Sequence, residues 1–261
     1  MKVVIKIGGA ALDDKAALET CARAIVQLAG SGHQVAVAHG GGKALTRTLK
    51  LLGKESVFVD GLRVTDRETR DVALMVLAGM VNKSLVAAIG ASGMPAVGLC
   101  GGDGLTFRAR RKPANGHDLG FVGEIVSVET RWLEAIWLQG GIPVLSSLAL
   151  GNDGEYYNVN ADQMAAACAI ACRANTLIFL TDVPGVRGAD GTVIRWLDSK
   201  QVSGLIENAV IAGGMLPKLE ACRYALSHGV GRVRILPAEQ GHRLPEFYSA
   251  KLDCGTEVLA A

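Results

Sequence analysis

The sequence predicts an α/β protein in which a mainly parallel sheet carries helices on both faces. Short apolar runs alternate with helix-like segments along most of the 261 residues, a pattern typical of parallel sheets. Runs such as Val35–Ala38 are apolar at every position, as expected for strands that are covered on both sides. Hydrophobic residues make up 49% of the chain and aromatic residues only 5%, which fits a core built mainly from Val, Ile, Leu and Ala.

The predicted strands are the short apolar runs, and the predicted helices are longer segments with apolar residues three or four positions apart. In chain order, the strands are Val3–Ile7, Gln34–Ala38, Ala96–Leu99, Pro143–Ser146, Leu177–Leu180 and Arg232–Leu236. The helices are Asp13–Ala29, Lys43–Leu52, Thr65–Ile89, Glu129–Leu138, Ala161–Ala171, Ser199–Asn208 and Pro217–Ser227. A division into two lobes is expected near Arg173–Thr176, which gives parts 1–173 and 174–261.

The longest predicted helix and two glycine-containing turns add detail to this outline. The helix carries an apolar stripe formed by Val72, Met75, Val76, Gly79, Met80, Val86 and Ile89. Such a stripe is typical of a core helix, and a dimer interface is the second interpretation. The segment Gly185–Gly191 predicts a hairpin, and Asn152-Asp153-Gly154 is a second turn signal, placed before Tyr156.

Charge and cysteine content exclude several classes of protein. The net charge of +2 is too small to indicate nucleic acid binding, and the basic run Arg108–Lys112 predicts a solvated loop or hairpin. The six cysteines form no CxxC pair, so buried thiols in a reducing cytosol are expected instead of a zinc site. The longest apolar stretch is taken as Met164–Cys172, too short for a bilayer, and the N-terminus has no signal-peptide pattern. A soluble, cytoplasmic protein without membrane contact is predicted.

Glycine, lysine and acidic residues gather where predicted strands end. Lys6 stands at the end of the first strand and is followed by Gly8 and Gly9. Glycine lets the backbone N–H groups come close to an anion, and lysine adds a mobile positive charge. Similar segments are His39–Gly42, Thr181–Gly185 and Gly213–Lys218. Several such strand ends in one chain indicate phosphoryl transfer.

Common nucleotide-binding and hydrolytic motifs are missing from the sequence. Gly40–Lys43 is followed by Ala44, and Val37 stands where a Walker A loop requires glycine. No GxGxxG follows a strand, and neither a GxSxG elbow nor an HExxH helix occurs. His39 is expected to fix the backbone of the glycine turn rather than to act as a base.

Six motifs follow one another along the chain: IKIGG at 5–9, HGGG at 39–42, GLRVTD at 61–66, NVNADQ at 158–163, LTDVPG at 180–185 and GGMLPK at 213–218. In this combination the chain closely resembles the amino-acid kinase family. GLRVTD together with NVNAD is most similar to the members that act on N-acetyl-L-glutamate. The likeness runs from about residue 2 to Gly255-Thr256.

The resemblance implies an αβα sandwich of two lobes. Residues 1–173 would bind the acetylated amino acid and form a homodimer, and residues 174–261 would bind ATP. The implied reaction transfers a phosphoryl group from ATP to the side-chain carboxylate of N-acetyl-L-glutamate in arginine biosynthesis, with Mg²⁺ held through ATP oxygens and water. Such a carboxylate titrates near ~4.3 and is already ionised at neutral pH, so no general base is needed.

The resemblance also assigns roles to residues. Lys6 would contact the transferring phosphoryl group, Lys218 would stabilise charge on the departing ADP, and Asp162 would orient both lysines. The substrate-binding residues would be Gly41, Gly42, Arg63 and Asn158. The ATP-binding residues would be Gly8, Gly9, Thr181, Asp182, Val183, Pro184, Gly185, Val186, Gly213, Gly214 and Met215.

Each of these residues taken alone has a plainer interpretation. Lys6 could cap an edge strand, Asp162 could be a first-turn acid favoured by the helix dipole, and Arg63 could make a surface ion pair. Lys218 could be a solvated helix residue, and Asn158 could belong to a turn. The occurrence of all six motifs in family order favours the functional interpretation.

Other functions compete with this one. The nearest is a sister kinase acting on another acid, such as carrier-linked aminoadipate, followed by glutamate, aspartate or carbamate kinases. A non-catalytic relative with the same fold and a dinucleotide-binding oxidoreductase are further alternatives. The chain starts directly with the first strand and lacks the N-terminal extension of arginine-inhibited hexamers, so a homodimer without strong arginine inhibition is expected. Some relatives bind the PII signalling protein, and the residues here give no indication of it.

Overall fold

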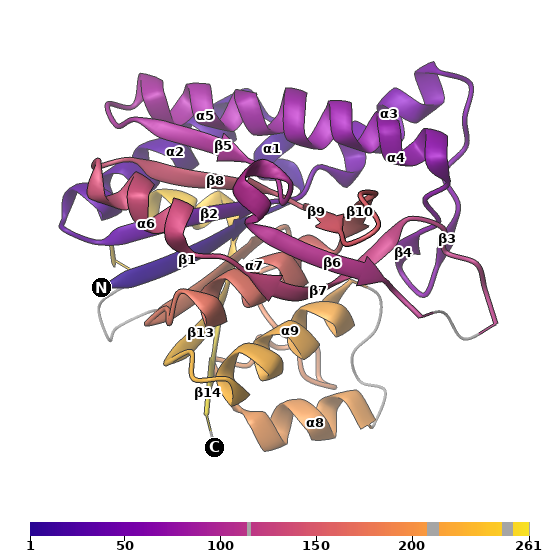
Figure 1. Cartoon of the computed structure of the whole chain (residues 1–261). Coiled ribbons are helices and arrows are strands. Elements are labelled where there is room, and N and C mark those ends of the chain that lie inside the picture. Colours follow the sequence, from indigo (N-terminus) through magenta and orange to yellow (C-terminus); the bar gives the residue numbers. More distant parts are fainter. Residues whose placement is uncertain (114–115, 208–213, 247–252, 261) are drawn as a thin grey trace.

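The structure, a computed structural model of the chain, describes residues 1–113, 116–207, 214–246 and 253–260 (Figure 1). Its centre is a sheet of eight strands. In chain order these are β1 (Lys2–Ile7), β2 (Gln34–His39), β5 (Ala96–Leu99), β8 (Ile142–Ser146), β11 (Thr176–Thr181), β12 (Trp196–Asp198), β13 (Arg232–Pro237) and β14 (Thr256–Leu259). The spatial order is β12-β14-β13-β11-β1-β2-β8-β5, and neighbours are parallel except β13 and β14. The predicted parallel sheet is confirmed, and all six predicted strands are present.

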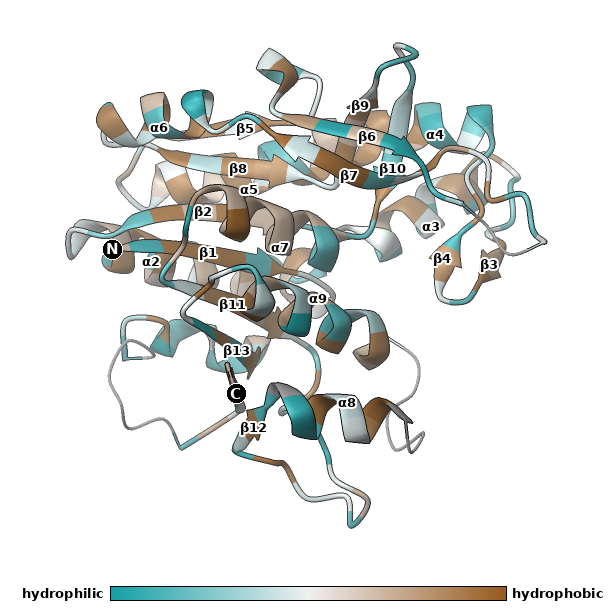
Figure 2. Ribbon diagram, turned by 60° about the horizontal axis from the view of Figure 1, so that its bottom comes forward, coloured by the Kyte–Doolittle hydropathy of each residue, from teal (hydrophilic) through white to brown (hydrophobic). Residues whose placement is uncertain are grey.

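Helices cover both faces of this sheet (Figure 1). One face carries α1 (Ala10–Asp13), α2 (Lys15–Gly30) and α5 (Asn82–Ala91), and the other carries α6 (Arg131–Leu138), α7 (Ala161–Ala171) and α9 (Met215–Ser227). Successive side chains of a strand point to opposite faces, so Val3 and Ile5 pack on the α2 side whereas Val4 packs on the α7 side. Figure 2 shows how apolar the central strands are. The three-layer αβα arrangement is therefore also confirmed.

A second, smaller sheet lies beside the central one and was not predicted. It is a closed barrel of β6 (Phe107–Arg111), β7 (Val122–Val128), β9 (Leu148–Gly151) and β10 (Tyr156–Val159). Of the two structures predicted for the basic run Arg108–Lys112, a loop or a hairpin, the hairpin is the observed one, because β6 pairs with β7. The turn at Asn152–Gly154 joins β9 to β10 as predicted. The hairpin at Gly185–Gly191 is also present, closed by the bridge between Arg187 and Val193.

Predicted helix starts differ from the observed ones by about two residues at the first and last long helices. The first long helix begins at Lys15 because the Asp14 side chain accepts a hydrogen bond of 2.7 Å from the Ala17 N–H. The last one begins at Met215, two residues before the predicted Pro217. The remaining described helices are α3 (Gly42–Leu51), α8 (Ser199–Glu207), the 3₁₀ turns η2 (Asp103–Leu105) and η3 (Ala238–Arg243).

The predicted helix Thr65–Ile89 is a composite of three segments. They are α4 (Arg67–Ala73), the π-helical η1 (Leu74–Val81) and α5 (Asn82–Ala91). Thr65 is outside the helix, where it bridges to Gly120. The two-residue strands β3 (Phe58–Val59) and β4 (Leu62–Arg63) form a hairpin just before it.

This composite helix, and not Met164–Cys172, contains the longest apolar stretch of the chain that the structure describes. The 25 residues Arg67–Ala91 have a mean hydropathy of 2.0 in their most apolar window, so length and composition alone would allow a membrane span. The core helix of a soluble protein passes the same test, and Val76, Leu85 and Ile89 are buried in the protein. Met164–Cys172 was therefore the wrong stretch to examine.

The expected lobe boundary near Arg173–Thr176 falls in the connection between α7 and β11. The central sheet continues across it, because β1 pairs with β11. The division into two lobes stays a prediction.

Candidate active site

The candidate site lies at the carboxyl edge of the central sheet. β1, β2, β8 and β11 are parallel, so the residues after their last positions meet at one edge. Gly8, Gly40 and Asp182 follow the first, second and fourth of these strands. Crevices outside the carboxyl ends of parallel strands are the usual binding sites of α/β folds.

Two lysines share one carboxylate at this edge. The Lys6 Nζ lies 3.0 Å from Oδ1 of Asp162, and the Lys218 Nζ lies 2.9 Å from Oδ2. β1 is a central strand, so Lys6 does not cap a sheet edge. Lys218 is only 5% exposed and therefore is not a solvated helix residue. The structure thus brings together three residues that are far apart in sequence.

Local structure explains how Asp162 reaches this position. Asn160 caps α7, and its Oδ1 accepts hydrogen bonds from the N–H groups of Asp162 at 2.9 Å and Gln163 at 3.2 Å. This cap places Asp162 in the first turn, where the helix dipole favours negative charge. The interpretation of Asp162 as a first-turn acid favoured by the helix dipole is therefore also true, and its ion pairs with the two lysines come in addition.

Burial and charge compete at these groups. Burial alone would raise the pKa of the Asp162 carboxyl, but Lys6 and Lys218 outweigh it and hold that pKa below its ordinary value. Burial lowers the pKa of the Lys218 ammonium, Asp162 raises it, and Lys6 lowers it again, with a net decrease. The Lys218 Nζ also lies 5.0 Å from the centre of the Phe179 ring. The carboxylate therefore keeps two ammonium groups close together, one half-buried and one buried.

The glycine pair after β1 packs against neighbouring site residues. A Cβ built on Gly8 would collide with Nζ of Lys6. Gly9 has φ of +56°, and a Cβ there would lie 2.5–2.7 Å from the Asp182 carboxylate. Glycine is required at these positions, because any larger residue would displace the lysine or the acid.

The other segments assigned to ATP surround the same edge. Thr181 is buried at the end of β11, and Asp182–Pro184 are exposed. Gly185 and Val186 are buried, and the Val186 N–H donates to Oγ1 of Thr256 at 2.9 Å. Gly214 is exposed and Met215 half-buried where α9 begins, whereas Gly213 lies outside the described residues.

A cavity of about 180 Å³ adjoins the lysine pair. The residues that line it include all four assigned to the substrate, Gly41, Gly42, Arg63 and Asn158. Asn160 and Ala161 line it too, directly before Asp162. The N-termini of α3 and α7 both open into this cavity, so it combines two positive helix ends with a guanidinium group. Its chemistry suits an anion.

Arg63 is fixed on several sides. It is 8% exposed, donates to Oγ of Ser56, and donates to Oγ1 of Thr46 at 2.7 Å and the Gly42 carbonyl at 3.1 Å. Its guanidinium carbon lies 4.7 Å from the centre of the Phe58 ring. Burial lowers the Arg63 pKa from its high ordinary value. A surface ion pair is thus the wrong interpretation of Arg63, and nothing in the sequence indicated these neighbours.

Asn158 is held by its neighbour in the GLRVTD motif. Its Nδ2 donates to Oγ1 of Thr65 at 3.3 Å, and that hydroxyl donates to the Arg63 carbonyl at 2.8 Å. The two motifs that discriminate within the family therefore meet in the structure. Thr65 is fully buried and was missed, since its role depends on this contact.

The described residues contain no group of three or more His, Cys, Asp or Glu side chains that could hold a metal ion. Both oxygens of Asp162 face lysines, which leaves it poorly suited as a ligand. A Mg²⁺ ion bound mainly through nucleotide oxygens and water fits this arrangement, because it needs no protein cage.

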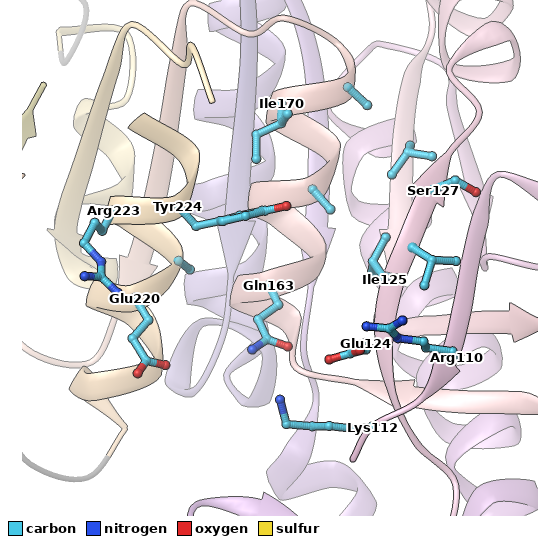
Figure 3. A pocket seen from close by; sticks show the side chains of 15 residues that line it. Arg110, Lys112, Glu124, Ile125, Ser127, Gln163, Ile170, Glu220, Arg223 and Tyr224 are labelled. Carbon is cyan, nitrogen blue, oxygen red and sulfur yellow. Dashed lines mark hydrogen bonds and ion pairs between the residues drawn. The ribbon is translucent and has the colours of Figure 1, made fainter. Parts of the chain in front are cut away.

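A second opening lies between β7 and the helices α7 and α9 (Figure 3). It has a volume of about 580 Å³, with an apolar floor that includes Ile125 and Ile170 and a rim of Arg110, Lys112 and Glu220. The lysine pair does not line it.

Comparison with known proteins identifies the family of the chain. The model of the amino acid kinase family matches residues 1–237. The chain belongs to the amino acid kinase family. Within this family it is 65% identical to an acetylglutamate kinase of Acidobacterium capsulatum, over 100% of both chains. It is 55% identical to an acetylglutamate kinase of Koribacter versatilis, over 100% of this chain and 99% of the relative.

Solved structures with the same family fold agree. N-acetylglutamate synthase from Neisseria gonorrhoeae, complexed with coenzyme A and N-acetyl-glutamate, superposes with a TM-score of 0.88 at 27% identity. The match covers 99% of this chain and 59% of that one. Carbamate kinase from Giardia lamblia, bound to AMP-PNP, has a TM-score of 0.73 at 15% identity, with 100% and 98% covered, and supports the fold alone.

Proposed function

We propose that this amino acid kinase phosphorylates the side-chain carboxylate of N-acetyl-L-glutamate with ATP, giving N-acetyl-L-glutamyl 5-phosphate for arginine biosynthesis. The observation that carries the proposal is the pair of lysines on Asp162, half-buried Lys6 and buried Lys218, next to a cavity with Arg63 and two helix N-termini. The relatives at 65% and 55% identity, both named acetylglutamate kinase, support the substrate.

The lysine pair would act on the migrating phosphoryl group. Lys6 would bind the phosphate oxygens that bear charge during transfer, and Lys218 would stabilise the charge that grows on ADP as it leaves. Asp162 would hold both ammonium groups protonated and in place. Phosphoryl transfer depends mainly on positioning and on charge stabilisation, so this arrangement suffices without an activated Ser, Cys or His.

The cavity would hold the acceptor. Arg63 would bind the α-carboxylate of the substrate, which the planar guanidinium can grip with two hydrogen bonds. The backbone N–H groups of Gly41 and Gly42 would bind the attacking carboxylate, and Asn158 would bind the amide region. Asn160 and Ala161 line the cavity and directly precede Asp162, which bonds both lysines, so the acceptor would lie near the lysine pair.

ATP would lie along the carboxyl edge of the sheet. Gly8 and Gly9 would approach its phosphates, and the segments Thr181–Val186 and Gly213–Met215 would contact the remainder of the nucleotide. Mg²⁺ would neutralise the phosphates and be held by them and by water. In this proposal, 1–173 binds the acetylated amino acid and forms the dimer, whereas 174–261 binds ATP.

The expected assembly is a cytoplasmic homodimer without membrane contact. Met75 and Met80 on η1 are 62% and 48% exposed, and Val97 on the sheet-edge strand β5 is 43% exposed. Apolar side chains on an open sheet edge are typical of an interface that another copy covers. All six cysteines lie in the described parts of the chain as free thiols, which supports a reducing compartment.

The activity can be tested by trapping the acyl phosphate. The protein is incubated with ATP, Mg²⁺ and hydroxylamine, and hydroxamate is measured with N-acetylglutamate, glutamate, aspartate and aminoadipate. Product is expected from N-acetylglutamate. The Lys218→Ala variant should lower kcat far more than it raises KM, because its contact strengthens in the transition state. Hydroxamate from another acid but not N-acetylglutamate would overturn the substrate, and no product from any acid would overturn the activity.

A further inference from the structure

The glycine turn after β2 rests directly on the composite helix. Gly41 has φ of +144°, which disfavours any residue with a side chain. A Cβ built there would lie 2.8 Å from Cδ2 of Leu77 and 3.2 Å from Cγ2 of Val81. The turn and the π-helical segment η1 are thus in close contact.

His39 connects the same turn to the helix through hydrogen bonds. It is fully buried, with its Nδ1 2.8 Å from the Gly40 carbonyl and its Nε2 3.0 Å from Nδ2 of Asn82. A carbonyl can only accept, so the Nδ1 carries the proton and the Nε2 accepts from the Asn82 amide. Burial lowers the His39 pKa to about 4, helped by Lys6 and Lys83 and opposed by the Gly40 carbonyl. The ring is therefore neutral at physiological pH.

Asn82 is itself anchored on every polar atom. Its Nδ2 also donates to the Val144 carbonyl at 3.0 Å, and its Oδ1 accepts from Nζ of Lys83 at 3.2 Å. It is fully buried, and a Cβ on Gly98 of β5 would collide with its Oδ1. Helix α5 begins at Asn82, where the π-helical segment ends. Such π-helical segments often occur at functional sites.

The His39 bond controls a group proposed for catalysis. The Gly40 carbonyl and the Gly41 N–H belong to one planar peptide unit. Fixing the carbonyl therefore fixes the direction of the Gly41 N–H, one of the donors proposed for the acceptor carboxylate. Displacements of about 1 Å in a reacting group can lower a rate by on the order of 100-fold.

We propose that Asn82, acting through His39, is a positioning residue that orients the Gly40–Gly41 peptide for phosphoryl transfer. The proposal rests on the function assigned above to the glycine turn. Neither residue lines the cavity proposed for the acceptor. We call the hydrogen bonds that run from Asn82 through His39 to the Gly40 carbonyl the relay. The relay joins the glycine turn to helix α5, so the orientation of the acceptor site depends on a helix residue outside the cavity.

Kinetics of Asn82→Leu test the relay. The substitution keeps the number and branching of the side-chain heavy atoms and removes both donors, and kcat should fall roughly 10- to 100-fold while KM for ATP changes little. Ser84→Ala is the matched control on the same helix, because the Ser84 hydroxyl only bonds the Met80 carbonyl of that helix. It should leave kcat unchanged. Rates are compared at a temperature where thermal melts show each variant folded.

Two His39 variants separate the relay from a general loss of packing. His39→Asn retains a donor near the Nδ1 position and should keep part of the wild-type kcat. His39→Gln places its amide near the Nε2 position only and should not keep that part. The double variant His39→Gln with Asn82→Leu should be no slower than His39→Gln alone, since both act through one path. Additive losses would contradict the relay.

A measurement on the wild type covers the case in which the variants do not fold. The ¹⁵N shifts of the His39 ring should show the neutral Nδ1–H tautomer, and the Nε2–H tautomer would overturn the proposal. Wild-type kinetics in Asn82→Leu would overturn it too. An inactive wild type with all acids would instead refute the proposed function.

Discussion

Asp162 illustrates what single residues contribute to this site. The ammonium groups of Lys6 and Lys218 lie 3.0 and 2.9 Å from its two carboxylate oxygens. These two positive charges repel each other, and the carboxylate between them offsets that repulsion and the cost of removing them from water. Removing that carboxylate should therefore change the titration of Lys218 as well as the geometry of both lysines.

The Asp162→Asn variant tests this electrostatic role. In the wild type, Asp162 raises the Lys218 pKa against burial and Lys6. Without that carboxylate the Lys218 pKa falls further. Since the protonated lysine is the active form, kcat is lost as pH rises through its pKa, and this basic limb should move to lower pH. Activity at pH 7 should also fall roughly tenfold or more. The measurement is kcat at saturating substrates from pH 6 to 10.

Glu220→Gln is the matched control, because it removes an exposed carboxylate two positions from Lys218 on α9. Its basic limb should coincide with that of the wild type. An unshifted limb in Asp162→Asn would mean that the carboxylate does not set the lysine pKa.

The charged residues of the site could be predicted from the sequence, whereas the residues that hold the site in place could not. Lys6, Asp162 and Lys218 stood out because strand ends and family motifs carry them. Asn82 gave no signal, since an asparagine in an apolar helix only gains meaning when His39 is brought beside it. Pairings of this kind depend on tertiary structure alone.

At the scale of elements, helix caps decide where site segments begin. Asp66 caps α4, and its Oδ1 accepts from the Thr69 N–H at 2.8 Å. Lys54 bonds the same carboxylate at 2.7 Å, and this bond, more than the cap, lowers the Asp66 pKa to about 2. The cap fixes the end of the GLRVTD motif, which carries Arg63.

Asp66→Ala should lower the free energy of unfolding by about 1 kcal/mol at pH 7, mostly from the lost cap, because exposed ion pairs add little. A carboxyl whose pKa falls on folding stabilises the protein above its unfolded pKa of about 3.8, and this contribution is lost as pH falls toward about 2. The charge-dependent part of the difference from wild type should therefore disappear below pH 4 in urea titrations, and the part due to the cap should remain, because a protonated carboxyl still offers an acceptor. Asp66→Asn keeps the cap acceptor and should retain most of the stability. Equal losses in both variants would assign the effect to the ion pair instead.

The strands of the small barrel show why some elements escaped prediction. β6 reads FRARR, in which buried Phe107 and Ala109 alternate with arginines instead of forming an apolar run. β9 and β10 have four residues each, so each offers too short a pattern. Long, continuously apolar strands were found because they lie inside the central sheet, where both faces are covered.

At the scale of the whole molecule, the order of the elements predicted the layers but not the pairing and direction of the C-terminal strand. The β-α alternation implies parallel strands, and this held from β5 to β13 across the sheet. β14 runs antiparallel to β13 and returns the chain along that edge. A three- or four-residue strand with a long-range partner carries no local signal of its direction.

The opposite edge of the sheet, at β5, provides the prediction for the assembly. Met75 and Met80 on η1 and Val97 on the edge strand β5 are exposed apolar side chains, and a second copy that covered them would remove them from water. Sedimentation should give about twice the chain mass of 27.2 kDa. The double variant Met75→Glu and Met80→Glu should sediment as a monomer, because buried like charges without partners oppose association. Leu138→Glu, which changes an 81% exposed leucine on α6, should remain dimeric. A monomeric wild type would contradict the dimer, and a dimeric double variant would place its interface on another surface.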